Sequence, residues 1–177
     1  MDKLRPDLIT QLGSLALASR LRRLSDRLMR DVARVYAEQK VAFEPRWFPL
    51  LYLLKQQTTV SVTDAARALG LTHPAINQIA GAMIKAGLVS GNRDRSDERR
   101  RLLKLTPRGK DTYATLTPIW RQIETANSEL LSETGHDLLA ILTSVESLLD
   151  AKDMYARITH RLDGKPHIQK TVIAKRK

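Results

Sequence analysis

The chain of 177 residues and 20.0 kDa suits one compact domain with extensions, and this length excludes a large two-domain enzyme. Its 30 Lys and Arg outnumber its 19 Asp and Glu, so the net charge of +11 makes nucleic acid the first partner to consider and an anionic membrane the second. The absence of Cys excludes disulfide scaffolds, thiol nucleophiles and zinc sites built on thiolates.

The N-terminal residues carry charges and a proline where a signal peptide would need an apolar core, so we expect no secretion signal. The apolar stretch 47–54 is far shorter than the roughly 20 residues that span a bilayer. The expected location is therefore the cytoplasm.

The first predicted helix covers residues 8–39, where leucines and valines recur mostly at intervals of three or four, with arginines between them. This periodicity is typical of one long amphipathic helix. Proline disfavours a helical conformation for the residue before it, so the Glu44-Pro45 step separates this helix from a short, apolar second helix over 46–55.

Capping residues mark the next two helices. Ser61 and Asp64 form a capping box ahead of a short helix, and Gly70 is placed as its left-handed C-terminal cap. Thr72 caps the following helix, which Gly87 stops. The apolar stripe of that helix consists of Ile76, Ile79, Ala80, Met83 and Ile84.

Two short strands are predicted over 88–92 and 101–105, because they flank a turn rich in Asp, Arg and Ser. Thr106 as a cap and Pro107 at the first helical position then start another helix. The elements together predict a mainly α fold with a small β-hairpin wing.

The C-terminal part is predicted to hold a last helix and a tail. A capping box from Thr134 to Asp137 starts that helix, whose apolar periodicity extends to about residue 162. Residues 164–177 include five basic and no acidic residues, and we interpret them as a flexible basic tail.

Charge is segregated along the chain. The net charge is +7 over residues 41–110, −6 over 111–156 and +6 over 157–177. This pattern indicates one face built for an anion and another built for a different purpose, although charge runs also mark ordinary solvated faces.

The order of helix, tight turn with Gly, helix and basic hairpin over residues 46–106 is that of a winged helix-turn-helix. The second helix of such a pair lies in the DNA major groove. Asn77 and Gln78 can each pair bidentately with adenine, while Thr72, His73 and Lys85 are placed to reach phosphates. Ordinary surface polarity is the alternative for Asn77 and Gln78. The predicted DNA-facing residues of this helix are Thr72, His73, Pro74, Ala75, Asn77, Gln78 and Lys85.

The hairpin turn holds five arginines within nine residues, 93–101. A thin β-ribbon tip bearing arginine can enter the minor groove. Asp97 is expected to accept turn amides and to orient a neighbouring arginine. A solvated turn is the alternative. The predicted DNA-binding residues of the wing are Arg93, Arg95, Asp97, Arg99 and Arg100.

These residues resemble a known family. Residues 94–100, followed by 103–109, resemble the wing signature of the MarR family of bacterial transcriptional regulators, and segments 68–70, 75–78 and 85–89 fit its helix-turn-helix. The resemblance covers about residues 8–160. Segment 43–49 further resembles a branch in which the MarR-like domain is fused to a GNAT-type acetyltransferase, and no acetyltransferase domain is expected in the short stretch after residue 162.

The resemblance implies a symmetric homodimer joined through the first helix and the last two, with two winged domains on successive major grooves. The amphipathic helices outside the winged domain independently call for an apolar partner, although a single-chain bundle is the alternative. The expected organisation is a dimerisation helix (1–45), a winged helix-turn-helix (46–106), C-terminal dimerisation helices (107–162) and the tail (163–177).

Catalysis and metal binding find no support in the pattern. The four histidines stand far apart without a carboxylate at metal-ligand spacing, and no phosphate-cradling glycine loop or nucleophile elbow is visible. We therefore expect no enzyme, no metal, no cofactor and no membrane binding.

An effector site is conceivable where aromatic residues gather. Tyr36, Phe43, Trp47 and Tyr52 could line a pocket for a small anionic or aromatic effector, with Arg46 for an anionic group, or they could simply be core. The expected function is a ligand-responsive repressor that binds a pseudo-palindromic operator as a homodimer. The alternative is a DNA-coating or architectural protein without a ligand response.

Overall fold

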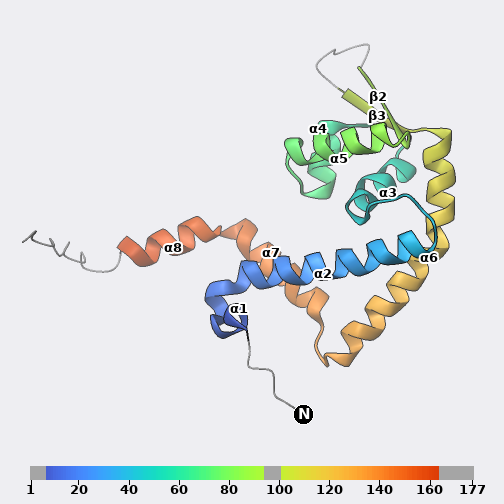
Figure 1. The fold of residues 1–177 in the computed structure, drawn as a ribbon. Helices are drawn as coiled ribbons and strands as arrows, with labels where there is room; N and C mark the ends of the chain where they lie inside the picture. The colour runs from blue at the N-terminus through green and yellow to red at the C-terminus, as the bar shows by residue number, and fades with distance from the viewer. Residues whose placement is uncertain (1–6, 94–100, 164–177) are drawn as a thin grey trace, which may run out of the picture. The chain divides into compact units, whose positions relative to one another are not determined.

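A computed structural model gives the fold of the chain and describes residues 7–93 and 101–163. The chain divides into two compact units, Met1–Glu124 and Thr125–Lys177 (Figure 1). The described residues are mainly helical with one small antiparallel sheet, so the predicted fold class is confirmed.

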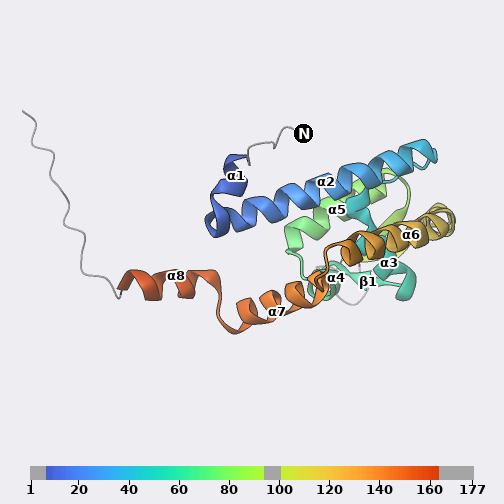
Figure 2. The ribbon, with the colours of Figure 1, turned by 90° about the horizontal axis from the view of Figure 1, so that it is seen from below.

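The N-terminal segment forms α1 (Leu8–Gln11), a 3-10 turn (Gly13–Ala16) and α2 (Leu17–Glu38), with α1 turned back beside the start of α2 (Figures 1 and 2). The prediction of one uninterrupted helix was wrong. Gly13 has a φ of +55°, a left-handed conformation that glycine adopts readily and that breaks the helix.

An exposed ion pair holds α1 against α2. The Asp7 carboxylate caps α1 by accepting from the Thr10 amide at 3.2 Å, and it also accepts from the Arg23 guanidinium of α2 at 2.7 Å. The hydrogen bond from Arg23 lowers the pKa of Asp7 to about 2. The contact between the two helices is therefore stabilised in part by charge, and Ala16 of the turn is buried.

The winged domain begins with a 3-10 turn (Pro45–Trp47) and α3 (Phe48–Gln56). The helix-turn-helix follows as α4 (Val62–Leu69) and α5 (His73–Lys85). All three caps predicted there are confirmed: Ser61 accepts from the Asp64 amide at 3.1 Å, Gly70 is left-handed, and Thr72 accepts from the Ala75 amide at 3.3 Å.

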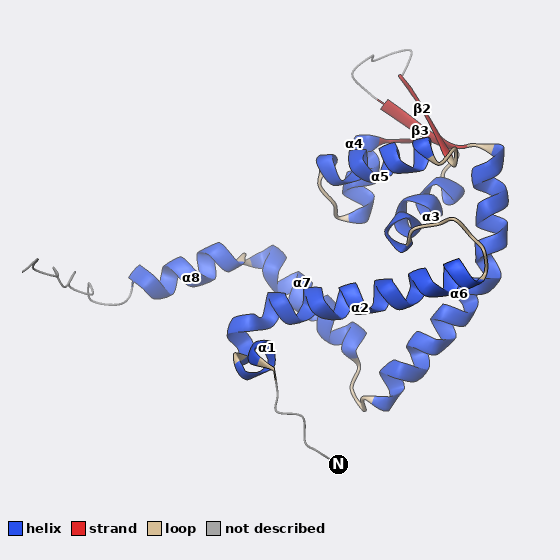
Figure 3. Cartoon of the chain, viewed as in Figure 1, coloured by secondary structure: helices blue, strands red, loops and turns tan. Residues whose placement is uncertain are grey.

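The sheet contains β1 (Val60–Ser61), β2 (Val89–Arg93) and β3 (Arg101–Leu105) in the order β1-β3-β2, all antiparallel. The β2–β3 hairpin was predicted within one residue, and Figure 3 shows it starting beside α5. Strand β1 was not predicted, because two residues cannot display the alternation that marks a strand.

The core of this unit lies between α3, α4, α5 and the sheet, and it also includes Tyr36 from the end of α2 and Leu116 from the helix that follows β3. It excludes water almost completely, since the largest side chains have at most 2% of their surface exposed. They are Tyr36, Leu50, Leu51, Leu54, Ile76, Met83, Leu88, Leu103 and Leu116.

Helix α6 (Pro107–Glu133) starts where it was predicted, and its start is locked to the turn after α5. The Thr106 hydroxyl accepts from the Gly109 amide at 3.0 Å and donates to the Gly87 carbonyl at 2.7 Å. A Cβ at Gly109 would lie 2.1 Å from the Leu88 carbonyl oxygen, so only glycine fits this contact.

The second unit comprises the end of α6 with α7 (Leu138–Ala151) and α8 (Met154–Asp163). Two predictions about it were wrong. Asp137, not Thr134, is the N-terminal cap of α7, since it accepts from the Ala140 amide at 2.9 Å. The single last helix is broken ahead of α8, where Asp153 accepts from the Ala156 amide at 2.7 Å and so caps a new helix.

The predicted basic tail, 164–177, lies outside the described residues. Within 7–93 and 101–163, no helix combines the length and the apolar character needed to cross a membrane.

Candidate DNA-binding interface

Helix α5 presents one polar face and buries the other. Ile76, Ala80 and Met83 have no exposed surface, so packing against the core fixes how the helix is rotated. The residues predicted to face DNA lie on the solvent side: Thr72, His73, Pro74, Asn77, Gln78 and Lys85 are exposed, and Ala75 is half-buried.

The turn before α5 fixes its entry angle. Gly70 has a φ of +62°, and the Leu71 amide donates to the Ala66 carbonyl of α4 at 3.0 Å. The Thr72 oxygen accepts the capping hydrogen bond, while its hydroxyl proton can still be donated to a phosphate. The start of α5, where base-reading side chains lie in helix-turn-helix proteins, is thus well held.

The structure describes the base of the wing but not its tip. Strands β2 and β3 pair from Val89↔Leu105 to Arg93↔Arg101. The predicted wing residues Arg95, Asp97, Arg99 and Arg100 lie outside the described residues, as does the side chain of Arg93.

Three of the five residues predicted to line an effector pocket belong to the core. Tyr36, Phe43 and Trp47 are 2%, 6% and 6% exposed, and successive rings meet edge to face at 5.6 Å. The Tyr36 hydroxyl accepts from the Trp120 indole nitrogen of α6 at 2.9 Å, and burial raises the pKa of Tyr36. The Trp47 indole nitrogen is buried without a hydrogen-bond partner among the described residues.

The other two predicted effector residues lie at the surface. The Arg46 guanidinium pairs with the Glu44 carboxylate at 2.6 Å, and both side chains are about half exposed. Tyr52 is 43% exposed, with its ring 5.6 Å from that of Phe48 and 6.2 Å from that of Tyr113. The structure therefore gathers only part of the predicted set.

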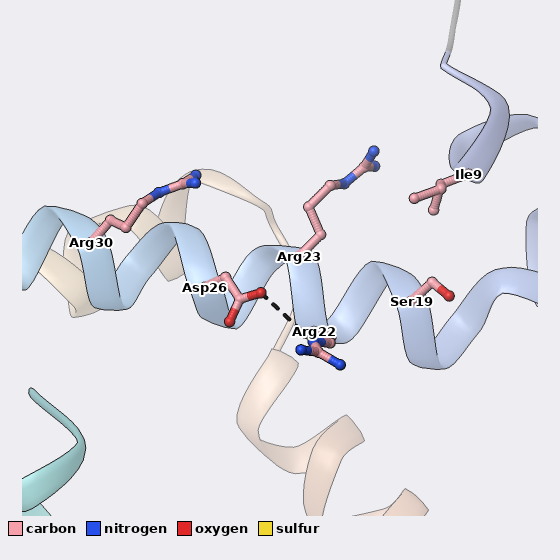
Figure 4. Close-up of a pocket in the computed structure, with 6 residues that line it drawn as sticks. All are labelled: Ile9, Ser19, Arg22, Arg23, Asp26 and Arg30. Carbon is pink, nitrogen blue, oxygen red and sulfur yellow. Dashed lines mark ion pairs between the residues drawn. The ribbon is translucent and has the colours of Figure 1, made fainter.

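A shallow depression of about 360 Å³ lies along α1 and the first half of α2 (Figure 4). None of the predicted effector residues lines it; its lining is Ile9, Ser19, Arg22, Arg23, Asp26 and Arg30. Two of its arginines already have acidic partners, because Arg22 pairs with Asp26 at 3.8 Å and Arg23 with Asp7 at 2.7 Å.

Acidic and histidine side chains form no metal centre in the part of the chain that the structure describes, where no group of three or more could hold an ion.

A capped helix-turn-helix that exposes a polar second helix beside an antiparallel hairpin defines a winged helix-turn-helix DNA-binding protein. Residues 43–100 match the model of the MarR family. The family resemblance noted in the sequence is thereby confirmed for the winged helix-turn-helix, which is similar to that of MarR-type transcriptional regulators.

Solved structures of similar fold include several regulators. The transcriptional repressor CouR, bound to a 23-mer DNA duplex, is 29% identical over 76% of this chain and 96% of its own, with a TM-score of 0.61. PcaV from Streptomyces coelicolor, in complex with its natural ligand, is 21% identical over 84% of this chain and 97% of its own, with a TM-score of 0.60.

A third structure is BpsR from Bordetella bronchiseptica, whose DNA binding is regulated by 6-hydroxynicotinic acid. It is 20% identical over 77% of this chain and 93% of its own, with a TM-score of 0.56. A comparison with curated protein sequences gave no match.

Proposed function

We propose that this regulator binds a pseudo-palindromic operator as a homodimer and represses transcription until a small molecule releases it. The observation that carries the proposal is the solvent-facing polar side of α5, held by a fully buried stripe beside a basic hairpin. The similarity to CouR, a repressor bound to a DNA duplex, supports the same arrangement.

Asn77 and Gln78 are the proposed base-reading residues, because each is exposed and can pair with the N6 and N7 edge of adenine. Thr72, His73 and Lys85 would contact phosphates, which fix the register of the helix without reading sequence. The wing arginines, Arg93, Arg95, Arg99 and Arg100, would enter the adjacent minor groove, with Asp97 orienting one of them.

Dimerisation is supported by apolar side chains that the chain does not cover by itself. Leu17, Leu21, Leu24 and Leu28 of α2 are 40–54% exposed. Leu139 and Leu148 of α7 are 61% and 59% exposed, and Ile158 of α8 is 51% exposed. Contiguous exposed apolar surface on a helix often marks an interface with another protein. A two-fold dimer would bury these faces and present two α5 helices to two half-sites.

A small anionic or aromatic effector is the proposed ligand. The indole nitrogen of Trp47 is buried and has no partner among the described residues, so an acceptor on such a ligand could satisfy this hydrogen-bond donor. Arg46 and Tyr52, which lie at the surface, would supply charge and ring contacts to the ligand. PcaV with its natural ligand and BpsR with 6-hydroxynicotinic acid are precedents among proteins of this fold.

Selection of bound sequences from a random DNA pool tests this function. A homodimer with two recognition helices should enrich two inverted half-sites about 10 base pairs apart, centre to centre. Enrichment of no sequence, with binding that depends on salt alone, would identify a DNA-coating or architectural protein instead.

A further inference from the structure

An arginine lies across the junction between α5 and the wing. If a Cβ is added to Gly91 of β2, it lies 2.7 Å from Nε and 3.1 Å from Nη2 of Arg101, and 3.1 Å from Cδ1 of Ile84. The Arg101 side chain therefore crosses β2 directly over the Gly91 backbone, on the side where Ile84 of α5 packs. Only a residue without a side chain leaves it this room.

Arg101 lies opposite Arg93 in the register of the hairpin. The two Cα atoms are paired, so two basic residues occupy facing positions of the antiparallel strands. Arg101 is exposed and forms no ion pair with any described residue. An external anion would supply a partner for its charge.

Two more cations border the same junction. Lys85 is the last residue of α5, and the Arg108 side chain lies over Gly87, with Cδ and Nη1 3.8 Å from a Cβ added there. Neither Lys85 nor Arg108 forms an ion pair with a described residue. The end of α5, the start of α6 and the hairpin thus each contribute one cation.

The docking of a winged helix puts a particular part of DNA against this junction. When α5 occupies the major groove and the hairpin reaches the neighbouring minor groove, the phosphate strand that separates the two grooves must pass over the junction of helix and hairpin. Arg101 lies at that junction. This step rests on the proposed mode of DNA binding.

We propose that Arg101 is a phosphate-binding residue that clamps this strand, and that Gly91 is required because it lets the guanidinium lie between wing and helix. A guanidinium held against the backbone can form two parallel hydrogen bonds to a phosphate with little loss of side-chain freedom. The contact would fix the spacing of α5 and wing on DNA for every sequence. It therefore contributes affinity and register rather than base preference.

The test compares Arg101→Gln with Lys104→Gln. Lys104 is exposed on the same strand and pairs with Ser90, so its side chain leaves the opposite face of the hairpin, and both variants remove one charge. Affinity is measured as a function of salt on two duplexes, one of mixed sequence and one selected by the unmodified protein. Arg101→Gln should weaken binding to both by about tenfold or more, and lower the salt slope by about 0.9 per subunit. Lys104→Gln should change affinity less than about twofold.

Gly91→Ala provides a second, independent arm. The added methyl group must displace Arg101, so this variant should lose about as much DNA affinity as Arg101→Gln. The double variant should lose no more than either single variant, because both remove the same contact. Thermal unfolding shows whether Gly91→Ala is folded; if it is not, the Arg101→Gln and Lys104→Gln pair decides the matter.

Each outcome separates this inference from the proposed function. Equal affinities and salt slopes for Arg101→Gln and Lys104→Gln would overturn the clamp, even if the unmodified protein selects a palindrome. Conversely, a protein that binds mixed duplex without enriching any sequence is not an operator-specific repressor, yet a specific loss in Arg101→Gln still supports the clamp. A protein that binds no duplex overturns both.

Discussion

The winged domain buries its large apolar side chains, whereas the helices outside it leave many of theirs exposed. In the winged domain, Leu51, Ile76 and Leu103 are completely buried and the helix ends are capped. On α2, leucines at the same helical spacing remain 40–54% exposed. An apolar stripe therefore indicates only that a helix needs a partner; whether the partner lies in the same chain depends on what else folds nearby.

The largest expected effect on stability comes from replacing one leucine in each region with alanine. Leu51→Ala should destabilise the winged domain by about 2–5 kcal/mol, since it removes a fully buried side chain and leaves a cavity. Leu24→Ala, at 48% exposure, should cost much less at low protein concentration and more as concentration rises, if its partner is a second copy. Urea unfolding at two concentrations measures both. Equal, concentration-independent losses would contradict the distinction.

A charge on the uncovered face of α7 should separate the subunits. Val145, 39% exposed, would be buried in a dimer, so Val145→Glu should raise the dimer dissociation constant by about a hundredfold or more. Sedimentation should show twice the chain mass for the unmodified protein and the single chain mass for the variant. Glu146→Gln, one position along the same helix, is the control. A protein that is monomeric before any substitution disproves the proposed dimer.

Two glycine substitutions inside the winged region should have opposite effects on stability. Gly109→Ala should cost about 1–3 kcal/mol or more, because its Cβ would strike the Leu88 carbonyl at 2.1 Å. Gly81→Ala in α5 meets nothing within 4 Å and should stabilise the helix by up to about 1 kcal/mol. Thermal unfolding of the two variants measures both changes in stability. A tolerated Gly109→Ala would mean that α6 can shift away from Leu88 without loss.

Removing a base contact is expected to change the binding free energy by a similar or smaller amount. Asn77→Ala and Gln78→Ala should each reduce discrimination between operator and mixed DNA by about 1–3 kcal/mol, because a bidentate base contact is lost. Lys85→Ala should weaken binding to all sequences about equally, because phosphates carry no sequence information. Competition titrations separate the two effects. Uniform losses in all three variants would show that α5 is not the reader.

The smallest expected effect concerns the ion pair between Asp7 and Arg23 beside the turn that joins α1 and α2. The pKa of Asp7 is lowered from 3.8 to about 2 by the hydrogen bond from Arg23, so the stabilisation of this turn is present above about pH 4 and is lost as pH falls through about 2. The amide resonance of Thr10, which donates to Asp7, should report this titration. Asp7→Asn should abolish the pH dependence and leave the unfolding of the winged domain unchanged.

Sequence patterns located most of the winged helix-turn-helix because its signals are local. The caps at Ser61, Thr72 and Thr106 each involve an amide three residues ahead, so neighbouring residue types suffice to predict them. The same holds for the left-handed Gly70 and for the stripe that rotates the polar face of α5 outward.

Long helices without such signals were predicted less well. The pattern of apolar residues runs through Gly13 and through Lys152 without a change, so periodicity alone could not show that each helix breaks there. Thr134 and Asp137 both accept a backbone amide, from His136 and Ala140, and only the backbone conformation decides that Asp137 is the cap of α7. Local preference is weak where several nearby residues can serve the same purpose.

The composition, the caps and the helical periods of this sequence determined the fold class, the second helix of the helix-turn-helix and the polar residues exposed on it, because each depends on a few neighbouring residues. Tertiary structure alone decided what depends on distant segments: the pairing of Val60 with Leu103, the burial of Tyr36 against Trp120, and the path of Arg101 over Gly91. These contacts join residues 10 to 84 positions apart, and no local pattern records which of the many possible pairs the folded chain brings together.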